Sequence, residues 1–153
     1  FFLMTAETLE SSGYIHYEIS NFALGEEFIS RHNRKYWLRV PYIGLGPGAH
    51  SFWGGIRWWN EGSITNYCEA LEAGRLPIEE SETLTEEQQR LESLCLGLRT
   101  REGVDLPLLR TYPGFEKVLS RLEDDNLVQV CGDRMIPTRE GFAVADSLPM
   151  LFL

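Results

Sequence analysis

The stretch from residue 31 to residue 60 constrains the fold of this chain more than any other part of the sequence. It contains all four tryptophans, two of the three histidines and five glycines. Residues 28–60 carry five Lys or Arg side chains and no Asp or Glu, although the whole chain has a formal net charge of −9. Rings provide stacking area, cations pair with carboxylates, and glycines permit close backbone approach. This mixture suits a flat, apolar, anionic ligand. It suits equally an aromatic edge of the core beside a solvated basic loop.

The length and composition allow one domain or two small ones. The chain has 153 residues, 43% of them hydrophobic, which is enough for a sizeable core. No apolar run approaches the ~20 residues needed to span a bilayer. The three cysteines lie far apart without a CxxC spacing, so we expect no disulfide framework and a reducing, cytoplasmic location. Because the chain enters a helical pattern directly at Phe1-Phe2, we expect it to be part of a longer protein.

The first residues read as one αβ step of an α/β sheet. Apolar spacing predicts a helix over residues 3–12 that ends at Gly13, and β-branched and aromatic residues predict a strand over residues 14–19. His16 and Glu18 share one face of that strand. The two polar side chains would either line a site or face solvent. A strand severed from its sheet would also expose an edge, through which a homodimer could form.

The sequence predicts a turn of helix at residues 32–37, which would bring several aromatic and polar side chains together. Helical spacing would place His32 beside Tyr36, and Asn33 beside Trp37, at positions i and i+4. The imidazole and the two rings would then form one compact patch. Further along the chain, Gly54-Gly55 between two β-rich runs predicts a hairpin.

The second half of the chain differs in character from the first, with a break near residues 76 and 77. Residues 77–153 contain 15 acids and 8 bases, against 8 and 6 in residues 1–76. An acidic linker is followed by a helix with a capping box at Thr85, then by a short helix, a third helix, a two-stranded ribbon and a closing helix over residues 138–148. This order is typical of a winged-helix domain.

The charge of the third helix argues against nucleic acid as a partner. Residues 115–125 contain Lys117 and Arg121 against four acids. Because phosphate neutralisation by cations supplies most non-specific DNA affinity, a helix of this sign would be repelled from a duplex. We therefore expect no nucleic-acid binding, and instead a packing or partner-docking role.

Several short blocks together resemble the heme-chaperone branch of the oxygen-independent coproporphyrinogen III oxidase family. The blocks are YEISNFA at residues 17–23, RHN at 31–33 with YW at 36–37, YIGLG at 42–46, GAHSF at 48–52 and RWWN at 57–60. The resemblance implies an α+β architecture. Residues 1–76 would form the end of a partial radical S-adenosylmethionine (SAM) barrel with the tetrapyrrole-binding segment, and residues 77–153 the acidic linker and a winged-helix-like C-terminal domain.

The family binds a [4Fe–4S] cluster and SAM through a CxxxCxxC motif, which this sequence lacks. Cys68, Cys95 and Cys131 cannot replace it, because cluster ligation needs closely spaced thiolates. The resemblance therefore implies that the cluster and SAM belong to the full-length protein. This chain alone is not expected to perform radical chemistry.

The HNxxYW pattern is associated with heme binding in the chaperone branch. The resemblance implies a tetrapyrrole site with His32 as the ligand of the heme iron, formed by Arg31, His32, Asn33, Tyr36, Trp37 and His50. Three functions remain open. The full-length protein would pass heme to recipient proteins, or decarboxylate a porphyrinogen in porphyrin biosynthesis as a true oxidase does, or the chain would serve only as a docking module.

Overall fold

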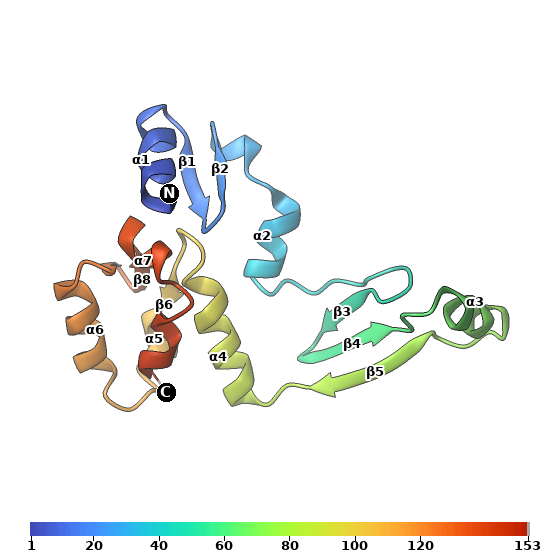
Figure 1. Ribbon diagram of the computed structural model, residues 1–153. Coiled ribbons are helices and arrows are strands. Elements are labelled where there is room, and N and C mark those ends of the chain that lie inside the picture. The colour runs from blue at the N-terminus through green and yellow to red at the C-terminus, as the bar shows by residue number, and fades with distance from the viewer. Residues whose placement is uncertain (153) are drawn as a thin grey trace. The chain divides into compact units, whose positions relative to one another are not determined.

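A computed structural model describes residues 1–152, with a mixed α and β secondary structure (Figure 1). The chain divides into two compact units. The first unit joins Phe1–Leu38 to Arg90–Leu153, and the second unit is Arg39–Gln89. This division differs from the expected boundary at residues 76 and 77. The segment expected to be an acidic linker is strand β5 (Ile78–Thr83), which pairs with strand β4 (Ile56–Asn60) of the second unit.

The first unit begins with the expected helix and strand. Helix α1 spans Phe2–Ser11, strand β1 spans Ile15–Glu18, and strand β2 (Asn21–Ala23) pairs with β1 in antiparallel register. A 3₁₀ turn, η1 (Glu26–Phe28), then leads into helix α2 (Arg31–Trp37). The predicted turn of helix within residues 32–37 is therefore confirmed.

Strand β1 has a neighbour on each side, contrary to the expected unpaired edge. Beyond its pairing with β2, the amide of Ile19 donates to the carbonyl of Arg99 at 2.9 Å, and the amide of Arg101 donates to the carbonyl of Tyr17 at 3.1 Å. A β-bridge joins Glu18 to Thr100 between them. The backbone amide and carbonyl groups at the end of β1, which we expected to be unpaired, thus form hydrogen bonds with a segment about 80 residues later in the chain.

The remainder of the first unit packs helices against a small sheet. Helix α4 (Glu86–Gly97) is followed by strand β6 (Val104–Asp105), helix α5 (Leu106–Leu109) and helix α6 (Phe115–Asp124). Strands β7 (Val128–Cys131) and β8 (Arg134–Pro137) complete an antiparallel sheet of order β6-β8-β7. The core beneath it includes Leu94, Leu98, Leu109, Leu122, Met135 and Leu148, each at most 2% exposed.

The closing helix is shorter than the sequence predicts. Helix α7 spans only Arg139–Ala143, with Thr138 as its N-cap, and a separate 3₁₀ segment, η2, spans Leu148–Phe152. Residues 144–147 between them form turns. Among the residues that the structure describes, no helix is long and apolar enough to cross a membrane.

The second unit is a three-stranded antiparallel sheet with one helix. Strand β3 (His50–Trp53) and β4 form the predicted hairpin, and β5 extends the sheet in the order β3-β4-β5. Gly54 and Gly55 have φ values of 59° and 80°, as a two-residue primed turn requires. Helix α3 (Ile64–Glu72) begins at the N-cap Ser63. All six residues of β5 are exposed, and β5 lies at one edge of the sheet.

Candidate functional site

Helix α2 carries five of the six predicted site residues. The hydroxyl of Ser30 caps the helix by accepting a hydrogen bond from the amide of Asn33 at 3.2 Å. His32 and Tyr36 meet as the i, i+4 spacing predicts, with ring centroids 5.1 Å apart and ring planes at 77°. Both side chains are exposed. The helix therefore presents an imidazole supported edge-on by a phenol ring.

The opposite side of α2 is fixed to strand β1 through Trp37. Its indole Nε1 donates to Oε2 of Glu18 at 2.6 Å, and the amide Nδ2 of Asn21 donates to the other carboxylate oxygen. Glu18 is only 2% exposed. Trp37 therefore contributes to the position of the helix. The sequence analysis did not identify Glu18 as its partner, although the even spacing of His16 and Glu18 marked the carboxylate as notable.

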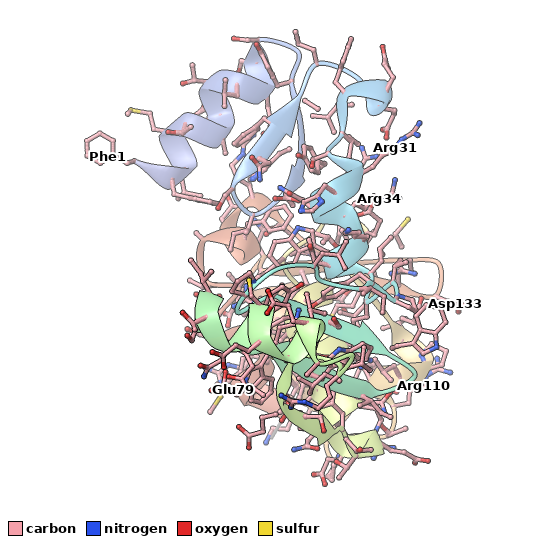
Figure 2. All side chains as sticks on the ribbon, turned by 90° about the vertical axis from the view of Figure 1, so that its right-hand side faces the viewer. Phe1, Arg31, Arg34, Glu79, Arg110 and Asp133 are labelled. Carbon is pink, nitrogen blue, oxygen red and sulfur yellow. The ribbon has the colours of Figure 1, made fainter. Side chains whose placement is uncertain are left out.

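The cations of the helix are partly engaged by neighbouring groups. Arg34 Nη2 lies 2.9 Å from Oε1 of Glu102, and the Lys35 ammonium lies 5.0 Å from the Tyr36 ring centre. Arg31 is exposed. Figure 2 labels Arg31 and Arg34 along this helix. Exposed ion pairs of this kind contribute little stability, so Arg34 can exchange Glu102 for another carboxylate at small cost.

His50 belongs to the second unit and so does not lie on the helix with the other five residues. It pairs across the hairpin with Trp59, and the two ring centroids are 5.5 Å apart. Arg57, on the same face of β4 as Trp59, forms an ion pair with Glu82 at 3.0 Å. Like His32, His50 is exposed.

A glycine-containing loop beside the hairpin is held by buried polar side chains. Nδ2 of Asn60 donates to the carbonyls of Gly44 at 3.3 Å and Gly46 at 3.0 Å, and the amide of Gly44 donates to the hydroxyl of Ser51 at 3.0 Å. Within residues 42–46, Tyr42 forms a β-bridge with Phe52. A cavity of about 360 Å³ adjoins this loop, lined by aliphatic side chains and by Trp58 and Tyr67.

The third histidine is a core residue. His16 is 8% exposed and stacks on Phe22 with ring centroids 4.1 Å apart, and Phe142 lies at 4.7 Å. Its Nδ1 lies 3.8 Å from Oε1 of Glu10. Burial lowers the pKa of His16 below its ordinary value, and its hydrogen-bonding contact with the carbonyl of Ile19 opposes the shift. Of the two interpretations of this strand face, the solvent-facing one is therefore wrong.

The described residues do not fit an iron–sulfur cluster. Cys68, Cys95 and Cys131 are free, and no group of three or more His, Cys, Asp or Glu side chains within residues 1–152 could hold a metal ion. Burial raises the pKa of the Cys95 thiol, which disfavours the thiolate needed for ligation.

No protein-family model matches the chain, but curated proteins do. The chain is 35% identical over 141 residues to a Mycobacterium tuberculosis protein named heme chaperone HemW, covering 92% of this chain and 35% of the relative. The heme chaperone HemW of Bacillus subtilis is 33% identical over 152 residues, covering 95% of this chain and 40% of the relative. The chain thus spans well under half the length of these relatives.

A solved structure shares the fold. The radical SAM enzyme coproporphyrinogen III oxidase (HemN) of Escherichia coli superposes with a TM-score of 0.69 at 18% identity, covering 97% of this chain and 39% of the enzyme. At this identity, the similarity establishes the fold alone. The sequence relatives and the shared fold agree with the family indicated by the sequence motifs. The chain is therefore a HemN-like C-terminal region, and over more than nine tenths of its length it is similar to proteins named heme chaperone HemW.

Proposed function

We propose that this chain binds heme on the outer face of α2, with His32 as the ligand of the iron. The observation that carries the proposal is the exposed imidazole of His32, set edge-on against Tyr36 on a basic helix. Neutral imidazole is a common axial ligand of heme iron, and an exposed ring can approach a planar macrocycle. Of the three histidines, His16 is excluded by its burial among aromatic rings.

The surroundings of His32 suit the two acidic side chains of heme. Arg31 is exposed, and Arg34 holds only a surface ion pair with Glu102. Each exposed contact between a cation and a propionate is worth about 0.2–1 kcal/mol, so these cations would orient the ring rather than supply most of the affinity. Tyr36 adds stacking area. Asn33 and Trp37, which are also four positions apart on α2, would keep the helix in position.

Among the functions considered, the chaperone is better supported than the oxidase. The curated relatives at 33–35% identity are named heme chaperones, whereas the likeness to the oxidase is one of fold. We propose accordingly that the full-length protein, with a cluster and SAM bound elsewhere, delivers heme to recipient proteins. The chain supplies the heme-binding surface and no step of radical chemistry.

The region from α4 to the closing helix α7 follows the order of elements of a winged helix, and we propose that it is one. Its helix α6 bears two bases against four acids through Asp125, so it would dock a protein partner and not nucleic acid. A mobility-shift titration with duplex DNA at low salt should show no complex. A retarded band at micromolar protein would contradict this assignment.

Heme titration of matched histidine variants tests the main proposal. His32→Ala should lose the shift of the Soret band and bind heme at least tenfold more weakly, since loss of even an outer-shell partner of a metal ligand costs about 10–100-fold. His50→Ala removes the other exposed imidazole and should leave the spectrum unchanged. If the spectrum of His32→Ala matches that of the parent while His50→Ala alters it, the ligand is His50. If neither alters it, the axial-ligand proposal is wrong.

A further inference from the structure

The carboxylate of Glu18 is buried in the first unit, and the two side chains that donate hydrogen bonds to it are neutral. It is 2% exposed, and its two oxygens accept hydrogen bonds from Trp37 Nε1, at 2.6 Å, and from Asn21 Nδ2. A buried charge is costly unless hydrogen bonds compensate for its lost hydration. Here both partners are side-chain donors from outside β1, one in β2 and one at the end of α2.

We propose that Glu18 is a positioning residue that fixes helix α2, and with it His32, relative to the β1–β2 hairpin. The effect of Glu18 on heme binding rests on the proposed function of His32, whereas the contacts of Glu18 with Trp37 and Asn21 do not involve heme. Trp37 is the last residue of α2, five residues beyond His32. The indole bond ends on a buried carboxylate, whereas the ion pair of Arg34 with Glu102 joins two partly exposed side chains.

The chemistry of the pair explains why a carboxylate is needed at this position. Indole N–H and amide NH₂ groups only donate toward Glu18, so the acceptor must offer two oxygens. A carboxamide of the same shape would offer one oxygen and turn its own NH₂ toward the second donor. In Glu18→Gln, the new NH₂ would face either Trp37, which cannot accept, or Asn21, whose amide would have to turn over to accept. In both cases the charge that strengthens the two hydrogen bonds is lost.

The backbone of β1 makes Glu18 a firm anchor. The strand is paired with β2 on one side and with residues 99–101 on the other, and Glu18 itself bridges to Thr100. Helix α2, in contrast, has seven residues, and isolated helices shorter than ~12–15 residues are marginal in water. Without the Trp37–Glu18 bond, the helix would keep its cap at Ser30 but lose its buried attachment at the other end.

Hydrogen exchange tests the positioning directly. Glu18→Gln and Trp37→Phe should each accelerate exchange of α2 amides such as those of Arg34 and Leu38 by about tenfold, because a hydrogen bond to a charged group is lost. Glu10→Gln is the matched control. It removes another carboxylate of the first unit, bonded to Arg139 of α7, and should leave exchange in α2 unchanged. Unchanged exchange in Glu18→Gln, or equal acceleration in Glu10→Gln, would overturn the proposal.

Heme titration separates this proposal from the assignment of the iron ligand. Glu18→Gln and Trp37→Phe should each weaken heme binding about three- to tenfold and broaden the Soret band, and the double variant should be no weaker than either. If His32→Ala abolishes the spectral shift but Glu18→Gln leaves affinity and band shape intact, the positioning role is wrong and the ligand assignment stands. If exchange in α2 accelerates while no variant affects heme, the helix anchor stands and the proposed heme site fails.

Discussion

Asn60→Ala should destabilise the second unit by about 2 kcal/mol, because the side chain of Asn60 holds the loop of residues 43–49 in place. Asn60 is 6% exposed, and its amide donates to the carbonyls of Gly44 and Gly46 at 3.3 and 3.0 Å. Each hydrogen bond between neutral groups contributes about 0.5–1.5 kcal/mol net, so losing both costs about 1–3 kcal/mol. The longer bond and the partial exposure of both glycines place the expected value near the middle of that range.

Urea unfolding followed by tryptophan fluorescence measures this loss, since Trp58 and Trp59 lie in the strand that ends at Asn60. Asn66→Ala is the matched control. Asn66 is exposed, and its amide makes only a 3.5 Å contact with Glu61, so its loss should change the free energy of unfolding by less than about 0.5 kcal/mol. Asn60→Asp provides a stricter test, because it keeps the shape but turns an acceptor toward two carbonyls. If Asn60→Ala and Asn66→Ala unfold at the same urea concentration, or if Asn60→Asp is as stable as the parent, the described role of Asn60 is wrong.

Three further predictions concern pH, salt and backbone strain. Burial lowers the pKa of His16, so the free energy of unfolding should keep its full value above the unfolded pKa of ~6.5. Below that pH it should fall by at most ~1.4 kcal/mol per pH unit. Urea unfolding of His16→Phe should depend less on pH than that of the parent. Arg31→Gln/Arg34→Gln should bind heme several-fold more weakly than the parent at low salt, with the difference shrinking at high salt; equal affinities at both would remove these cations from the site. Gly103→Ala should cost about 3 kcal/mol or more in thermal unfolding, because Gly103 has φ +66° and an added Cβ would lie 2.1 Å from the Met135 carbonyl oxygen.

Elements with strong local signals were predictable from the sequence. The capping box at Thr85 forms as expected, with Thr85 Oγ1 accepting from the Gln88 amide and Gln88 Oε1 accepting from the Thr85 amide. The Gly54-Gly55 hairpin and the contact of His32 with Tyr36 also follow from spacing alone. In each case the interacting residues lie within a few positions of one another, so local geometry determines the contact.

Elements that depend on distant partners were not predictable. Strand β5 has the sequence IEESET, whose acids and lack of alternation hide a strand that pairs with β4 some 20 residues earlier. The pairing of β1 with residues 99–101 leaves no local pattern either. The same limit applies to the candidate site. The HNxxYW residues could be identified as a group, but the burial of Glu18 beneath Trp37 decides which of them face inward.

The interrupted first unit imposes an order of events during synthesis. Every residue of the second unit has been added once position 89 is reached, whereas the first unit still lacks Arg90–Leu153 at that moment. Strand β1 cannot pair with residues 99–101 until those residues have been synthesised. Glu10 likewise cannot form its ion pair until Arg139, 129 positions later, has been added. Such distant closures are slow compared with local helix and hairpin formation. On the ribosome, the hairpin sheet should therefore mature first, and α1, β1 and α2 should remain open to chaperones and proteases until the last third of the chain emerges.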